Sequence, residues 1–252
     1  MKLGAQLRKL DQRLRTLTVL GILDQLQKLS VVVVVIFWFS GCQERKVQAH
    51  FQAWQVVNSA HGGGGDGGRL DALQKLNGDH VSLARVRLDS AYLSYVNLAG
   101  ARLDQASLAG AFLDSARLAG ARLRGASARG ANFNSSDLTD ADLTGARLDS
   151  AKIVGATLSG AVAVGADFTG AILRRTVLRG TALTGATLAG ADLSDADLQD
   201  AALSGADLRG AQLSNVRNWS RIQSMSGARL GGVRNAPPGF VEFARRQGAI
   251  EG

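Results

Sequence analysis

Residues 186–195 read ATLAG ADLSD, and this pair of units decides the fold, because the same five-residue pattern runs unbroken over residues 81–215. The central residue of each unit, position i, is Leu in 22 of the 27 units. Ala stands at i−2 in 21 units, and Gly stands at i+2 in 15 units. A five-residue period fits neither the two-residue alternation of a strand nor the roughly 3.6-residue turn of an α-helix.

This period predicts an all-β solenoid with four sides. If the residues at i and i−2 both point inward from one short extended segment, the residue at i+2 must turn the chain through about a right angle. Gly tolerates such a turn, and Ser, Asp and Asn favour it by bonding their own backbone. Four turns close a square coil of about 20 residues, and successive coils stack at about 4.8 Å. Positions one coil apart are therefore expected to lie directly above each other.

The interior of such a coil is narrow, which explains the recurrence of Ala at i−2. Two central residues are undersized, Ala128 and Ala163, and in each case the next central residue is a phenylalanine, Phe133 or Phe168. Interior voids of that size lower stability. We therefore expect each Phe to fill the room that its neighbour leaves.

The repeating unit resembles that of the pentapeptide-repeat family, commonly written A-(D/N)-L-x-x. The closest copies begin at Ala141, Ala191, Ala196 and Ala206. The flanks resemble those of membrane-anchored bacterial members, in which A-W-Q-x-x-N-(S/A)-A precedes a Gly-rich loop and A-L-Q-x-L-N; the counterparts are residues 53–60 and 72–77. The resemblance implies a right-handed quadrilateral β-helix and a non-enzymatic role, without supplying a partner.

The N-terminal segments predict a membrane anchor. Residues 1–28 form a basic amphipathic pattern, with leucines at three- and four-residue spacing, which suits a membrane surface or a partner. Residues 29–42 read LSVVVVVIFWFSGC, a run that spans about 21 Å as a helix against a hydrocarbon core of about 30 Å. Flanking Lys and Arg side chains extend this reach by snorkelling. The expected anchor residues are Val31, Val35, Phe37, Trp38 and Phe39.

Three alternatives remain open for these segments. The amphipathic pattern also fits a solvated helix that packs on its own chain. The apolar run also fits a buried strand or core helix, because β-branched residues favour strands. Residues 39–42 loosely resemble a lipoprotein cleavage box in which Cys42 is lipidated, although the preceding basic region is longer than a signal peptide normally has.

The charge around the apolar run predicts a location and an orientation. Six Lys/Arg precede the run and two follow it closely, which favours a cytoplasmic N-terminus. We therefore expect a membrane-associated protein, single-pass or deeply inserted, in a bacterial inner or thylakoid-type membrane, with lipid among its partners.

Both ends of the solenoid are expected to carry caps, because an open end exposes unpaired strand edges. Residues 43–80 predict two short helices joined by a Gly-rich loop. Residues 216–252 predict a helical C-terminal cap, since Asn218 breaks the frame and apolar residues then recur at helical spacing: Trp219, Ile222 and Met225, followed by Phe240 and Phe243. A dimerisation module is the alternative for this tail, so homo-oligomerisation stays open.

Residue types in the array argue against an enzyme. Residues 81–215 contain no His, Glu or Cys, and their aspartates recur at outward positions like a solvated surface. The chain has one cysteine, which excludes an intrachain disulfide and a cysteine-based metal site. We therefore expect no catalytic residue, no cofactor and no metal.

The charge balance separates the remaining functions. The net charge is +8, but residues 81–216 carry thirteen basic and thirteen acidic residues, so the excess lies at the termini. The expected function is a membrane-tethered, non-enzymatic scaffold or interaction module with an unidentified protein partner. One alternative is a DNA mimic that binds a topoisomerase, as some members of the family do, which needs an acidic rod. The other is direct nucleic-acid binding through the basic termini.

The outward residues of one face suggest where a partner binds. Positions one coil apart place Tyr92, Phe112, Lys152 and Ile172 in one column, and exposed aromatic and aliphatic groups flanked by Arg are typical of an interface core. The predicted contact residues are Tyr92, Tyr95, Phe112, Lys152, Val154, Ile172, Arg174 and Arg175. The alternatives are drift on a tolerant surface, or N-terminal helices that cover Tyr92 and Phe112.

Overall fold

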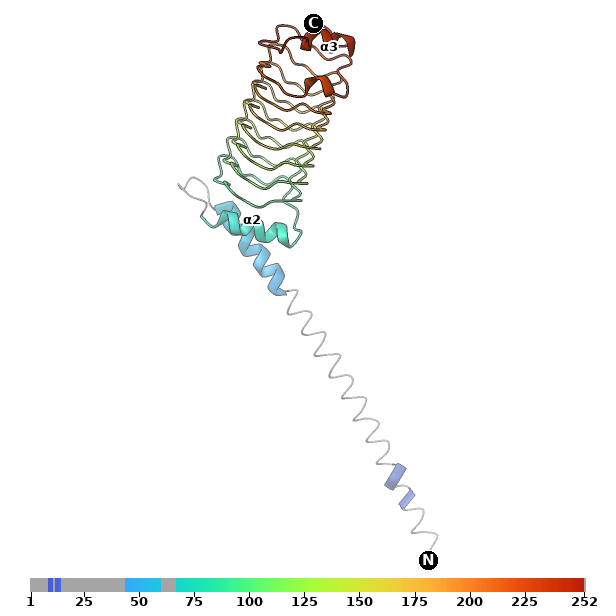
Figure 1. The fold of residues 1–252 in the computed structure, drawn as a ribbon. Helices are drawn as coiled ribbons and strands as arrows, with labels where there is room; N and C mark the ends of the chain where they lie inside the picture. Colours follow the sequence, from blue (N-terminus) through green and yellow to red (C-terminus); the bar gives the residue numbers. More distant parts are fainter. Residues whose placement is uncertain (1–8, 11, 15–43, 60–66, 252) are drawn as a thin grey trace, which may run out of the picture. The chain divides into compact units, whose positions relative to one another are not determined.

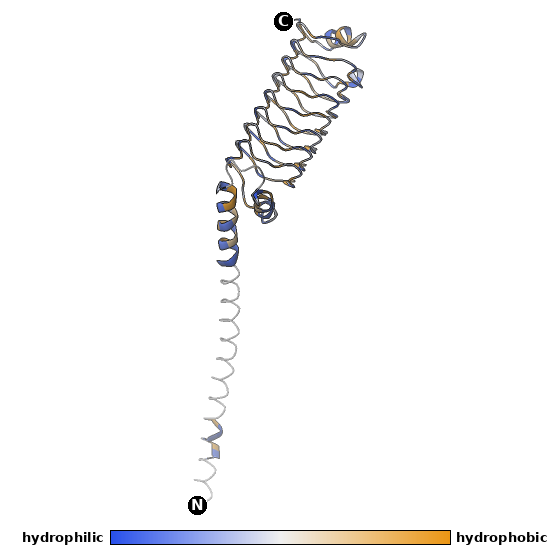
Figure 2. Cartoon of the chain, turned by 90° about the vertical axis from the view of Figure 1, so that its left-hand side faces the viewer, coloured by the Kyte–Doolittle hydropathy of each residue, from blue (hydrophilic) through white to orange (hydrophobic). Residues whose placement is uncertain are grey.

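The computed structural model describes residues 9–10, 12–14, 44–59 and 67–251 (Figure 1). The chain divides into two compact units, Met1–Gln52 and Ala53–Gly252. In the first unit the described residues are helical. The second unit contains the stacked coils, which Figure 2 shows from the side.

The coils are joined by parallel bridges between residues that lie 20 positions apart. These bridges run without interruption from Arg87↔Ser107 to Asp197↔Arg217, and each bridging residue is the one at i−1. The backbone repeats the same hydrogen bonds on every face; the Leu88 N–H, for example, donates to the Ser107 carbonyl at 2.7 Å. In the described residues the bridges are isolated, one residue per face, and do not form longer strands. The predicted four-sided solenoid is confirmed.

Each corner of the coil is a β-turn whose third residue has a positive φ. All 27 residues at i+2 between 85 and 215 have φ between 53° and 68°, whether they are Gly or not. The turn closes where the N–H of the next i−2 residue donates to the carbonyl of i, as Ala91 does to Leu88 at 3.1 Å. This is the geometry of a type II turn, which favours Gly at that position. Tyr95 (φ 64°) and Arg175 (φ 56°) adopt this conformation without being Gly. The repeat as a whole therefore imposes the corner, and not the residue type at that position alone.

The interior of the solenoid is dry and narrow. The central residues are buried, and Phe133 and Phe168 have no exposed surface. Thr176 and Thr181 replace Ala at i−2 and are also fully buried. Their hydroxyls donate to the carbonyls of Ile153 and Leu158, each at 2.8 Å. A buried hydroxyl is tolerated there because it has a partner.

The solenoid continues beyond residue 215, which differs from the expected boundary. The bridge Ala202↔Ser224 spans 22 positions, so two extra residues enter the coil between Arg217 and Ser224. The 3₁₀ helix η1 (Trp219–Arg221) lies in this insertion. A regular unit, ARLGG, follows at 228–232, and the last bridge joins Arg229 to Ile250. The region from 216 onward therefore extends the solenoid by a further coil as well as forming a cap.

The C-terminal end is closed by α3 (Phe240–Arg246). Phe240 is fully buried, and its ring meets that of Trp219 edge-on at 5.9 Å. Phe243 meets Trp219 in the same way at 5.5 Å. The expected helix over 219–225 is therefore only the three residues of η1, and α3 supplies the apolar cover.

Helical residues of the second unit cover the N-terminal end of the solenoid. In this unit residues 53–59 are helical, and α2 spans Arg69–Gly78. Val57, Leu73 and Leu76 are fully buried in the same core as the repeats. The side chain of Asn77 donates to the Ala99 carbonyl at 3.0 Å. This contact satisfies a backbone acceptor that the first coil would otherwise leave exposed.

The expected membrane location requires a correction. Among the residues that the structure describes, no helix combines the length and the apolar character needed to cross a bilayer. The described helical residues 44–59 include the charged residues Glu44, Arg45 and Lys46. The predicted inserting segment 29–42, with its anchor residues Val31, Val35, Phe37, Trp38 and Phe39, lies outside the described residues.

Candidate interaction surface

The residues predicted to contact a partner lie on one face of the solenoid. Bridges join Tyr92 to Phe112 and continue through Asn132 and Lys152 to Ile172. The next two outward positions of each unit hold the remaining members of the predicted set. We call the eight predicted residues the aromatic face: Tyr92, Tyr95, Phe112, Lys152, Val154, Ile172, Arg174 and Arg175.

The aromatic residues of this face are stacked and exposed. The rings of Tyr92 and Phe112 are parallel within 5°, with centroids 4.9 Å apart. Tyr92 is 46% exposed, Phe112 39% and Tyr95 75%. The described N-terminal residues of the second unit therefore do not cover these side chains. Stacking fixes both rings before any partner arrives, which lowers the entropic cost of using them in an interface.

A network of polar side chains supports the aromatic pair. The carboxylate of Asp114 accepts hydrogen bonds from Ser94 at 2.8 Å and Asn132 at 3.5 Å. The Asn134 side chain accepts from the Val154 N–H at 2.9 Å, which links two coils. Sequence reasoning assigned no role to Ser94 or Asp114. Their signal was present, since a short polar residue one coil from an Asp is placed to bond it.

The opposite end of the aromatic face is basic and aliphatic. Lys152, Arg174 and Arg175 are exposed, whereas Val154 and Ile172 are half-buried. The Arg174 guanidinium lies 3.9 Å from the Asp192 carboxylate. The face thus has an aromatic part and a basic part, separated by the asparagines at 132 and 134.

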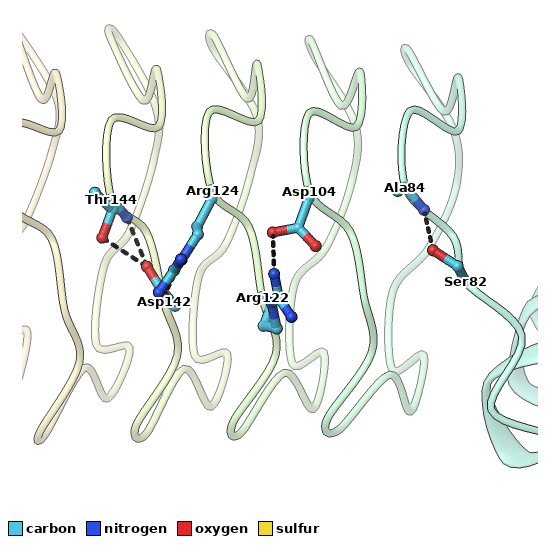
Figure 3. Close-up of polar contacts among 7 residues, drawn as sticks. All are labelled: Ser82, Ala84, Asp104, Arg122, Arg124, Asp142 and Thr144. Atoms are coloured by element: carbon cyan, nitrogen blue, oxygen red, sulfur yellow. Dashed lines mark hydrogen bonds and ion pairs between the residues drawn. The ribbon is translucent and has the colours of Figure 1, made fainter.

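A second group of exposed apolar residues lies on another face and was missed at the sequence level. Val162 and Val164 are 40% and 38% exposed, and they flank the central residue Ala163. The same face carries Asp104–Arg122 and Arg124–Asp142 ion pairs, which Figure 3 shows with Thr144 bonded to Asp142. The stretch AVAVG at 161–165 gave the signal, because the residues on both sides of the central Ala163 are Val.

One carboxylate, that of Asp197, is buried where the frame changes. Its side chain is 1% exposed. Burial alone raises the pKa of Asp197. Hydrogen bonds from Asn218 at 2.8 Å, Arg179 at 2.8 Å and the Gln199 N–H at 3.2 Å outweigh it, so the pKa lies below its ordinary value. Asn218 has a left-handed φ of 55° at the start of the insertion. The carboxylate therefore anchors the turn that admits the two extra residues.

We expect Asp197→Ala to lower the melting temperature at neutral pH and to flatten its acid dependence. A depressed pKa stabilises the fold above the unfolded-state value near 4, and that contribution is lost as pH falls through the folded-state value. Removing a buried charge-assisted network typically costs about 1–3 kcal/mol. Thermal melts of both proteins between pH 7 and pH 2 measure the effect. A variant whose melting temperature falls with acid as steeply as that of the unmodified protein contradicts this role.

The described residues contain no group of three or more His, Cys, Asp or Glu arranged to hold a metal ion. Cys42 lies outside the described residues. The chemistry that the described surface offers is therefore aromatic stacking, ion pairing and aliphatic contact.

The sequence was compared with protein families and with curated proteins. A profile described as "Pentapeptide repeats" matches eight copies, at residues 82–118, 116–153, 141–180, 151–188 and 181–217, which together span more than half of the chain. No curated protein matches the chain.

Three solved structures are among those similar to this chain. Trypsin-treated QnrB1, a plasmid-mediated fluoroquinolone resistance protein, is 18% identical, with 66% of this chain and 87% of that chain covered and a TM-score of 0.35. HetL from the cyanobacterium Nostoc sp. strain PCC 7120 is 27% identical, with 68% of this chain and 76% of that chain covered and a TM-score of 0.24. HetL is a pentapeptide repeat protein involved in heterocyst differentiation regulation. Rfr23 from the cyanobacterium Cyanothece 51142 is 34% identical (40% and 62% covered, TM-score 0.21).

Proposed function

This chain belongs to the pentapeptide repeat family, and from that premise we propose that its right-handed β-helix is a non-enzymatic scaffold that binds a protein partner through the aromatic face. The observation that carries the proposal is the exposed, stacked Tyr92–Phe112 pair. Aromatic residues held in place at a surface are typical of interface hot spots. The partner is a protein that presents an apolar or aromatic group to this pair and acidic groups to Lys152, Arg174 and Arg175.

Energetics support the aromatic pair as the anchor of the interface. Each ring still exposes a large part of its surface, and burying apolar area contributes about 25 cal/mol per Å². The network around Asp114 holds the neighbouring coil in place. The face therefore gains affinity from burial without ordering a flexible loop.

The filled interior supports a role without catalysis. Side chains at i and i−2 occupy the inside of every coil. Some surface aspartates are engaged in bonds that join neighbouring coils; Asp142 and Asp149 each accept from an Arg side chain of the preceding coil. A regular ladder of this kind offers a binding surface and not a reaction chamber.

Charge argues against the two alternatives from sequence. A DNA mimic needs an acidic surface, and the repeats carry equal numbers of acidic and basic residues. Nucleic-acid binding through the C-terminal end needs excess positive charge, and there part of that charge is neutralised, because Arg221 and Arg245 pair with Asp200 and Glu251.

The proposal is tested by replacing Tyr92, Phe112 and Ile172 together by Ser. A photo-crosslinking amino acid at position 95 is expected to capture one defined protein in host cells, and the triple variant is expected to lose at least about 90% of that product, since hot-spot residues carry most of the binding energy. Thr157→Ser with Val177→Ser, on the adjacent face, is the matched control and keeps the product. Equal capture by the triple variant and the control refutes the aromatic face.

A further inference from the structure

The face opposite the aromatic face carries an arrangement that the proposed function does not use. Its ladder runs Arg102↔Arg122↔Asp142↔Val162↔Ala182. Two corners separate it from the aromatic face in either direction around the coil, so the two faces point away from each other. We call it the arginine–valine face, and its members are Arg85, Arg102, Arg122, Arg124, Val162 and Val164.

The first part of this face carries more guanidinium groups than carboxylates. Arg122 pairs with Asp104 at 3.3 Å, and Arg124 pairs with Asp142 (Figure 3). Arg85 donates to the neutral side chain of Gln105 at 2.9 Å. Arg102 is exposed, and none of the ion pairs among the described residues includes it. Four guanidinium groups therefore face two carboxylates.

The position of Arg102 makes this excess unfavourable in the free protein. It lies directly opposite Arg122 in the ladder, and like charges at opposed positions of neighbouring strands destabilise a sheet. A carboxylate supplied from outside would relieve that repulsion and form charge-assisted hydrogen bonds with both guanidinium groups. The arrangement is complementary to an acidic ligand.

The second part of the face is aliphatic. Val162 and Val164 lie at two outward positions of one unit, each more than one-third exposed. The next coil continues with Ala182, and the corner beside it is Gly185. No charged residue interrupts the face between Val162 and Ala202. This part is complementary to an aliphatic side chain.

We propose that the arginine–valine face is a second docking surface, which takes an extended acidic peptide segment of a partner protein that ends in aliphatic residues. Two coils separate Arg122 from Val162, which is about 10 Å, and an extended chain advances about 3.4 Å per residue. The aliphatic residues of the segment therefore lie about three residues from its acidic ones. With the aromatic face on the other side, the solenoid holds two partners at once.

The valines favour a peptide over a nucleic acid. A phosphate backbone would satisfy the guanidinium groups but has no aliphatic group for Val162 and Val164. A second copy of this chain is a further occupant that the test must separate. A peptide is the proposed occupant, because it uses both the basic part and the aliphatic part of the face.

The test is fluorescence anisotropy with a labelled peptide that carries three successive glutamates and two leucines three residues after the last of them. Arg102→Glu with Arg122→Glu is expected to weaken binding at least about tenfold at low salt, because it reverses two contacting charges. Val162→Ser with Val164→Ser is expected to weaken it about threefold to tenfold. Replacing both leucines of the peptide by serines should reproduce the second loss.

Matched variants make the result specific. Arg129→Glu with Arg147→Glu changes the net charge equally but lies on the adjacent face, and it should leave the affinity within about twofold, apart from general screening effects. The Tyr92, Phe112, Ile172 variant should also bind normally, which separates this inference from the proposed function. If a charge-reversed variant fails to fold, as judged by circular dichroism, Arg102→Gln with Arg122→Gln replaces it.

Four outcomes overturn the proposal. They are no measurable binding of the peptide to the unmodified protein, an equal loss in the adjacent-face control, tighter binding of an oligothymidine than of the peptide, and self-association in light scattering that the Arg102 and Arg122 substitutions abolish. Selective loss at the arginine–valine face alone supports it.

Discussion

Replacing Phe133 by Ala is expected to lower the free energy of unfolding by about 3–5 kcal/mol, the usual range for a buried Phe. Phe133 has no exposed surface, and its neighbouring central residue, Ala128, is also buried. The interior has no flexible segment that could collapse into the space, because every coil is held by hydrogen bonds to the next. Phe168, which follows Ala163, should behave in the same way. Urea unfolding followed by circular dichroism measures the change.

A second pair of variants tests whether Phe133 and Ala128 compensate each other. Phe133→Leu alone leaves a void, and Ala128→Leu alone overfills the coil, which typically costs about 1–3 kcal/mol. The double variant has two leucines, as most pairs of units do. Its loss in free energy of unfolding should be smaller than the sum of the losses of the two single variants. Strict additivity would show that the two sites are independent. A loss below about 1 kcal/mol for Phe133→Ala would show that the ring does not fill the space beside Ala128.

Leu143→Asp is expected to disrupt the coil that contains it, at a cost of several kcal/mol. Leu143 is 2% exposed, and the buried residues of the neighbouring units are Ala, Leu, Phe and Ile, apart from Ser136, whose hydroxyl already donates to the Phe133 carbonyl at 2.7 Å. The introduced carboxylate must either stay ionised without a partner or take up a proton at a raised pKa. Each course opposes folding near neutral pH.

Hydrogen exchange locates the Leu143→Asp effect, because repeat proteins open locally between neighbouring units. Amides in the coils next to residue 143 should lose protection, while those near the C-terminal cap keep it. Ser127→Asp, at an outward position, is the control and should change stability by less than about 0.5 kcal/mol. Equal effects of the two substitutions would mean that the interior is wet.

The repeat period predicted the fold because the path of the backbone is determined by the five-residue period and not by the detail of each side chain. A five-residue period requires a corner in every unit, so even Tyr95 and Arg175 adopt the left-handed φ that Gly would favour. The same argument placed Tyr92, Phe112, Lys152 and Ile172 in one ladder, and the bridges join them in that order. Where the period holds, residue number alone gives the face.

The remaining features depend on packing that the period does not encode. Asn218 ends the pattern, so the sequence predicts a helical cap where the structure has a two-residue insertion and a further coil. The return of the unit at Ala228-Arg229-Leu230 was the available signal. The parallel stacking of Tyr92 on Phe112 depends on side-chain torsions, and the buried bonds of Thr176 and Thr181 depend on which carbonyl lies within reach.

Cysteine crosslinking between coils tests the stacking of positions 20 apart most directly. In a Cys42→Ser background, Ser107→Cys with Ser127→Cys places two thiols on bridged residues of one face, at a separation that a disulfide can span. We predict rapid intramolecular oxidation of this pair and none for Ser107→Cys with Asn132→Cys, which lies one face further around the coil. Oxidation of the second pair in preference to the first would contradict the four-sided coil and every assignment of faces made from it.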